Sequence, residues 1–199
     1  MSNTRSNELG TETREDRLVE RRLETLDDIP REIADRRLQA EFSGLISPER
    51  SEILRERPDR IEKPDEFKES AKKAGLEHTD GVLGWSTDLE SPAHVLKGEV
   101  PKEITTLIHE DLHRFTHPET LKEMRANPAL HELHEGITEY FTDRAAAGLH
   151  DYKSGECYPE QVKAAEKLAG EIGERNLRGF FFQHEMTEET QKALDQLSR

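Results

Sequence analysis

Residues 109–113 of the chain read His109-Glu110-Asp111-Leu112-His113. On an α-helix its two histidines lie four residues apart, so both imidazoles leave the same face about one turn from each other. Two neutral imidazole nitrogens can then hold one zinc ion, and Glu110 lies beside them, where its carboxylate can accept a proton from water. Zinc lowers the pKa of a water molecule that it binds towards about 7. The stretch therefore predicts zinc ligands at His109 and His113 and a catalytic base at Glu110.

The residues around this stretch indicate a helix with one buried face. Pro101 suits the first helical turn. Apolar side chains then recur at helical spacing, at Ile104, Leu107, Ile108 and Leu112. Because the chain holds 9 His and 43 acidic residues, the HExxH pattern by itself can arise by chance. A helix with a buried face and two histidines at its edge favours the metal site over chance.

A second segment offers the third metal ligand. A catalytic zinc site generally takes three protein ligands and leaves a fourth position for water. Glu135 lies 22 residues after His113, which is enough chain to turn at Asn127-Pro128 and return on an antiparallel helix. Glu139 lies one turn beyond Glu135 on the same face. The spacing predicts Glu135 as the third ligand and Glu139 as the acceptor of the outer N–H of a zinc-bound histidine.

The two segments together resemble those of the gluzincins, the group of zinc peptidases that contains thermolysin and the zinc aminopeptidases. In that group HExxH is followed by a segment of the form E-G-x-x-E/S-Y-F, which here runs from Glu135 to Phe141. The resemblance implies the third zinc ligand at Glu135 and a carboxylate behind the ligands at Glu139. His134 departs from the pattern, because the aminopeptidases tend to have Asn there.

A narrower resemblance adds Thr116-His117-Pro118 and the later segment that begins at Tyr158. With these, roughly residues 80 to 185 resemble compact bacterial metallopeptidase domains of polymorphic toxins and of the cargo of contractile injection systems. This resemblance implies Zn²⁺ as the cofactor and a protein or peptide as the substrate. It further implies a toxin or effector that is made in the cytoplasm and delivered by an injection or secretion apparatus, with an immunity protein as a second partner.

Other side chains compete for roles in this site. His117 lies four residues beyond His113, but Pro118 disfavours helical geometry at His117. His131 and His134 lie close enough in the chain to approach the metal. Charge in the transition state needs a stabilising donor, for which the candidates are Tyr140, Tyr152, Tyr158 and His184.

Three other classes of function stay open. The first is a zinc-binding effector that acts on something other than peptides. The second is an interaction module whose HExxH is fortuitous, and the third is a secreted housekeeping peptidase. The third is disfavoured because no basic and then apolar leader opens the chain. Metal content separates the first two, since a zinc protein binds zinc and the module binds none.

Composition is consistent with one small domain and an appendage. The 199 residues are 32% hydrophobic and 36% charged. A net charge of −14 without a basic stripe argues against nucleic-acid binding. The single cysteine, Cys157, excludes an intramolecular disulfide. No apolar run approaches about 18 residues. We therefore expect a soluble protein with no membrane span and no signal peptide.

The first part of the chain, residues 1–58, is expected to be a charged extension. Residues 1–12 are polar and lack periodicity, which predicts disorder. Two exposed helices should follow, separated at Pro30, and a short helix should begin at Pro48 and end before Pro58. Since this pattern offers little apolar surface, the extension should add little to folding stability, and we interpret it as a delivery leader or a lid.

The second part, residues 59–199, is expected to be the zinc metallopeptidase domain. A helix should run from Pro64 to Ala74, and two short strands should lie within residues 81–87 and 93–96, before the motif helix. The edge of such a strand pair can bind an extended peptide. Trp85 is expected to pack in the core, with the cleft as the alternative. Further helices near 160–175 and 186–197 complete a mainly α (α+β) fold, which we interpret as a gluzincin-like zincin core with an N-terminal helical extension.

Overall fold

The computed structural model describes residues 14–56, 58–76, 79–89, 91–149 and 158–197. In these residues the chain is mostly helical with a small three-stranded sheet, as the mainly α prediction expected. The strands are β1 (Arg60–Glu62), β2 (Gly84–Trp85) and β3 (His94–Leu96). The helices are α1 (Arg14–Phe42), α2 (Pro48–Glu56), α3 (Pro64–Lys73), α4 (Val100–Phe115), α5 (Pro118–Arg125), α6 (Pro128–Ala146), α7 (Pro159–Ile172), α8 (Glu174–Gln183) and α9 (Glu188–Leu197).

Prolines mark where many of these helices begin. A proline in the first turn costs no hydrogen bond, because the amide that it lacks would have no partner within the helix. The sequence supplies such prolines at Pro48, Pro64, Pro101, Pro118, Pro128 and Pro159. The predicted starts at Pro48 and Pro64 are therefore confirmed. The helix predicted near 160–175 is α7, which ends at Ile172 because Gly173 has a left-handed φ of 83°. Helix α8, which follows directly, was not predicted.

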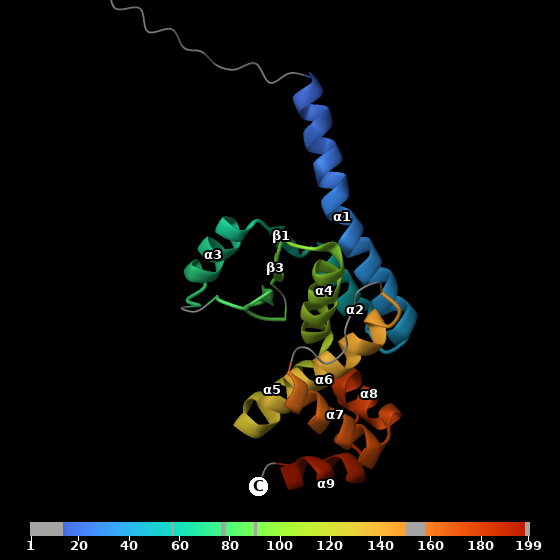
Figure 1. The fold of residues 1–199 in the computed structure, drawn as a ribbon. Helices are drawn as coiled ribbons and strands as arrows, with labels where there is room; N and C mark the ends of the chain where they lie inside the picture. Colours follow the sequence, from blue (N-terminus) through green and yellow to red (C-terminus); the bar gives the residue numbers. More distant parts are fainter. Residues whose placement is uncertain (1–13, 57, 77–78, 90, 150–157, 198–199) are drawn as a thin grey trace, which may run out of the picture.

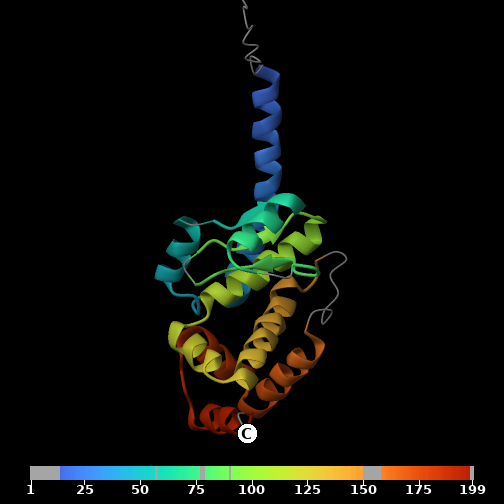
Figure 2. The same cartoon turned by 90° about the vertical axis from the view of Figure 1, so that its left-hand side faces the viewer.

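Helix α4, which carries the HExxH stretch, lies at the centre of the molecule. Helices α1 and α6 and strands β2 and β3 all contact it. Figure 1 shows α3 and the sheet beside α4, with α7, α8 and α9 at the end of the molecule that holds the C-terminus. In Figure 2 helices α6 and α7 run beside each other below the sheet. The motif helix is thus held between the helical layer and the sheet.

The sheet has the strand order β1-β3-β2. Strand β3 pairs antiparallel with β2, with Trp85 opposite His94, which confirms the predicted strand pair. It also pairs parallel with β1, with Ile61 opposite Val95, and this third strand was not predicted because it has only three residues. Strand β2 is therefore an edge strand of the described sheet. It also packs against α4.

A buried ion group fixes the sheet against α4. Arg114, on α4, is only 1% exposed, and its guanidinium donates to the carboxylates of Asp59 and Asp111. The Asp59 carboxylate also accepts the Ala93 amide at 2.9 Å. Because Asp59 precedes β1 and Ala93 precedes β3, one arginine links the motif helix to two strands. Loss of one partner from such a buried group would leave an uncompensated charge, which typically costs about 3–5 kcal/mol.

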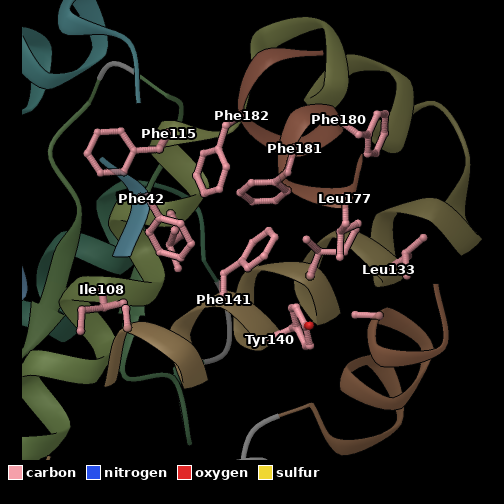
Figure 3. Close-up of a cluster of buried hydrophobic side chains, with 14 of the residues drawn as sticks. Phe42, Ile108, Phe115, Leu133, Tyr140, Phe141, Leu177, Phe180, Phe181 and Phe182 are labelled. Carbon is pink, nitrogen blue, oxygen red and sulfur yellow. The ribbon is translucent and has the colours of Figure 1, made fainter. Parts of the chain in front are cut away.

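Phenylalanine rings from three helices form the centre of the core. Figure 3 shows Phe42 of α1, Phe141 of α6, and Phe181 and Phe182 of α8 in one cluster. The ring centroids of Phe42 and Phe141 lie 5.4 Å apart, as do those of Phe141 and Phe181. Edge-to-face contacts of this kind add to the stability that burial provides. The phenylalanines at 180–182 thus pack α8 onto the rest of the domain.

The glycine after Glu135 permits a close approach of α7. A Cβ atom at Gly136 would lie 2.1 Å from the backbone oxygen of Gln161, which is far inside van der Waals contact. Any side chain at position 136 would therefore push α7 away from α6. In the Glu135-Gly136 pair, the glutamate is a candidate metal ligand and the glycine allows α7 to pack closely against α6.

Helix α1 corrects the prediction of an exposed extension. The chain continues through Pro30 as one 29-residue helix instead of breaking there. Ala34, Leu38 and Phe42 recur every four residues and lie in the main core, each no more than 1% exposed. The expectation that residues 1–58 add little to stability is therefore wrong for residues 34–42. The first half of α1 does extend away from the other elements (Figure 1). Residues 1–12, where disorder was predicted, lie outside the described residues.

We expect Phe42→Ala to destabilise the fold by about 3–5 kcal/mol, because truncation of a fully buried phenylalanine removes apolar burial and leaves a cavity. The matched control is Ile29→Ala, since Ile29 lies in the same helix and is 43% exposed. That change should cost less than about 0.5 kcal/mol. Urea unfolding measures both. Equal midpoints for the two variants would contradict the placement of α1 in the core.

Candidate metal centre

Two helices bring the three predicted ligands together. His109 and His113 lie on α4, Glu135 lies on α6, and one ligand atom from each falls within 4.8 Å of the others. The two Nε2 atoms lie 3.0 Å apart, and a Glu135 oxygen lies 3.3 Å from His113 Nε2 and 3.7 Å from His109 Nε2. Two imidazole nitrogens and one carboxylate oxygen are the donor set of many catalytic zinc sites. The cluster can therefore hold a metal ion.

The outer nitrogens of both imidazoles have acceptors. Nδ1 of His109 lies 2.9 Å from Oε2 of Glu139, which is 6% exposed. Nδ1 of His113 lies 3.4 Å from the hydroxyl oxygen of Thr138, whose own proton goes to the His134 carbonyl at 2.9 Å. Each Nδ1 is thus placed to carry the proton and donate it, which leaves both Nε2 lone pairs directed at the same point. The predicted place of Glu139 behind His109 is what the structure has.

Charge in the cluster is balanced between the two helices. Burial disfavours the charged form of His109, but the Glu135 and Glu139 carboxylates outweigh burial and raise the pKa of His109 to about 10. Burial would also raise the pKa of Glu135, but hydrogen bonds from His109 and His113 hold it well below its ordinary value. Without a metal ion, a charged His109 is therefore ion-paired with Glu135 and Glu139.

Glu110 lies beside this cluster and is 7% exposed. Burial raises its pKa, and the neighbouring His113 and His109 oppose that rise. A raised pKa suits a carboxylate that must accept a proton and then give it up. The backbone of β2 approaches closely here, because a Cβ at Gly84 would lie 2.7 Å from a Glu110 carboxylate oxygen. Glycine at position 84 is what lets the edge strand lie against the Glu110 carboxylate.

A cavity of about 210 Å³ opens over the ligands. Its wall includes β2 and the loop after it, α4, α5, the first turns of α6, and Tyr158. The Tyr158 ring stacks on His109 with centroids 5.9 Å apart and planes 12° from parallel. Trp85 also lines the cavity and is half-buried, so the cleft placement holds for it in place of the core.

Only part of the predicted set of stabilising side chains lines this cavity. Tyr158 does, whereas the Tyr140 hydroxyl bonds Glu174 at 3.1 Å on another side of α6. Nε2 of His184 lies 3.3 Å from Glu123, outside the cavity wall. Tyr152 and Cys157 lie outside the described residues.

The competing histidines take other roles. His117 caps α5 by accepting the Glu119 amide, so it does not reach the ligands. His131 and His134 line the cavity, but neither belongs to the three-residue cluster. His134 is buried against the Thr116 hydroxyl at 3.1 Å, and burial holds its pKa well below the ordinary value. A neutral imidazole therefore adjoins His113.

Several residues of the site were missed in the sequence. Thr138 follows Glu135 by three residues, so helical spacing alone could have placed it on the same face. Gly84, Leu121 and Arg125 also line the cavity, but only the packing of β2 and α5 against α4 and α6 brings them there. No pattern in the sequence near these three residues predicts that they line the cavity.

Comparison of the chain with known protein families, with curated proteins and with solved structures gave no match. Among the described residues, no helix is both long and apolar enough to cross a bilayer.

The geometry predicts one metal ion per chain. Alanine at His109, His113 or Glu135 should remove most of the metal, because each change deletes a ligand atom. Glu110→Gln should keep it, since Glu110 is not one of the three ligands. Elemental analysis of the purified variants measures this. Full metal content in Glu135→Ala would refute the assignment and direct attention to Glu139.

Metal binding should release protons. His109, with its pKa of about 10, is charged at neutral pH before a metal binds, and a metal ion needs the neutral imidazole. Binding at pH 7 should thus expel about one proton from His109, and affinity should rise with pH by roughly tenfold per unit below that pKa. Calorimetry in buffers of different ionisation enthalpy counts the protons. Binding without proton release would contradict the ion-paired state of the free site.

Proposed function

We propose that this protein is a zinc-dependent peptide-bond hydrolase, a metallopeptidase. One observation carries the proposal. Two imidazole Nε2 atoms and the Glu135 carboxylate converge, while Glu110 lies against them at the floor of a cavity. The donor set is typical of catalytic zinc with one position left for water. A purely structural site would be closed by a fourth protein ligand, and among the described residues the cluster has three.

The side chains divide the chemistry among them. Bound zinc would polarise the scissile carbonyl and acidify water. Glu110 accepts the proton of the attacking water and gives it to the amide nitrogen as the C–N bond breaks. Glu139 and Thr138 hold the imidazoles in the tautomer that presents Nε2. The Tyr158 hydroxyl, on the cavity wall at the His109 end, is the described candidate for stabilising the developing oxyanion.

The sheet supports a peptide as the substrate. Strand β2 lies at the edge of the described sheet and lines the cavity through Gly84 and Trp85. An extended peptide can add to such an edge through backbone hydrogen bonds. This edge lines the same cavity as His109, His113 and Glu135. A zinc-binding effector with another kind of substrate remains the second candidate, since the metal centre itself does not select peptides.

The gluzincin assignment and the role as a toxin or effector rest on the sequence resemblance. Delivery by a contractile injection system and an immunity partner rest on it too, as hypotheses. The metal and the reaction can be tested without them.

Glu110→Gln should lower peptide cleavage about 10²-fold or more, because the amide cannot take the proton. Zinc content and melting temperature should stay close to those of the parent. The matched control is Glu132→Gln, since Glu132 is exposed and does not line the cavity. That variant should cleave normally. Measurements on a casein digest or a peptide mixture decide, and a fully active Glu110→Gln would mean that the proton goes elsewhere.

A further inference from the structure

The cavity over the metal ligands has two different ends. Tyr158 lies at the His109 end, where its ring stacks on that imidazole. At the other end His113 adjoins His134, with ring centroids 4.9 Å apart. The wall there is completed by Leu121 and Arg125 of α5 and His131 of α6, and the Arg125 charge acts on His134. This part of the wall, formed by Leu121, Arg125, His131 and His134, is called the basic end.

Arg125 is a cation without a described partner. Among the residues lining the cavity it is the one Arg or Lys, and in the described part of the chain it has no hydrogen bond or ion pair. Lys122, on the same helix, is by contrast paired with Glu119 at 3.2 Å. His131 lies in the first turn of α6, where the helix dipole adds positive potential. The basic end is thus attractive to an anion.

The acidic side chains of the cavity are already engaged. Glu135 and Glu110 belong to the metal centre. Asp88 lies on the wall but accepts the Ser91 amide at 2.6 Å and the Ser91 hydroxyl at 2.8 Å. Among the described side chains of the wall, the charged one that no described group engages is therefore Arg125.

We infer that the basic end binds a carboxylate of the substrate through Arg125. The inference rests on the proposed function and adds a substrate class to it. The bound group lies next to the scissile bond on the side of His113, either as an Asp or Glu side chain or as the free C-terminus of a short peptide. A guanidinium recognises both through paired N–H donors. A cavity of about 210 Å³ holds one such residue, since pockets for drug-sized ligands start at roughly 300 Å³.

Cleavage of a defined peptide library tests the inference. One library has amidated C-termini and the other has free C-termini, and mass spectrometry reads the cut sites. The zinc-loaded protein should favour Asp or Glu at one fixed position beside the cut, by about tenfold over Asn or Gln. If the carboxylate is the terminal one, the preference appears only in the free library, with cuts at a fixed distance from the end. Absence of any acidic preference in both libraries, with cleavage intact, overturns the inference.

Charge reversal identifies the residue. Arg125→Glu should turn the acidic preference into one for Lys or Arg at the same position. Lys122→Glu is the matched control, because it makes the same change one turn earlier on α5 outside the cavity. It should leave the preference as in the parent. An unchanged preference in Arg125→Glu would overturn the inference.

A binding measurement separates this inference from the reaction. Two hydroxamates that differ only in a side-chain carboxylate or its amide are titrated into zinc-loaded Glu110→Gln by calorimetry. The carboxylate compound should bind about tenfold more tightly, and Arg125→Glu in the same background should abolish or reverse the difference. If no peptide is cut but this selectivity holds, the peptidase proposal fails and the carboxylate site stands. Equal binding of the two compounds refutes the site.

Discussion

The contact between α4 and α6 is the constraint on which the rest of the molecule depends. It places a carboxylate from one helix against two imidazoles from the other, and neither helix can build the centre alone. Charges this deeply placed are costly unless each has a partner. Here the Glu139 carboxylate and the Thr138 hydroxyl accept from the imidazoles, and Glu135 lies between the two Nε2 atoms. The aromatic cluster centred on Phe141 packs α6 against α1 and α8.

The sheet is positioned by a second polar group on the opposite side of α4. Arg114 directly follows His113, a candidate ligand. Its bond to Asp59 fixes the strands relative to α4. Strand β2, which lies against Glu110, is paired with β3, whose lead-in residue Ala93 also bonds Asp59. The strand edge that we propose for substrate binding and the Glu110 carboxylate, our proposed base, are therefore positioned by the same buried group. Helix α4 is thus fixed by two polar groups: the cluster of His109, His113 and Glu135 towards α6, and the Arg114 ion group towards the sheet.

Local spacing explains what the sequence could predict. His109, Glu110 and His113 lie within one pentapeptide, and Glu135 and Glu139 within another, so helical geometry alone sets each group. Tyr140 shows the limit of using a motif without that geometry. It follows Glu135 by five residues, about 140° around the helix, and its hydroxyl accordingly bonds Glu174 on another side of α6.

Contacts between distant segments explain what could not be predicted. Gly84 and Arg125 reach the cavity from β2 and α5, and no pattern near either residue indicates it. In α1 the buried positions Ala34, Leu38 and Phe42 were present at regular spacing, but dense charge between them indicated a solvated helix. In the structure these three side chains face the core, and Arg37 and Glu41 add hydrogen bonds to the end of α6 and to α8.

Helix α1 is continuous from its outer first half to its buried last turns. At about 1.5 Å per residue its 29 residues span on the order of 40 Å, from Arg14 to a phenylalanine in the core. Pro30 has no amide proton, so the hydrogen bond to the Leu26 carbonyl is missing, and this is the point at which the rod bends most easily. A load on the outer half would therefore be relieved at Pro30, before it reached the buried strip of Ala34, Leu38 and Phe42. Pro30 is itself buried, so this bending point lies where the helix meets the rest of the molecule.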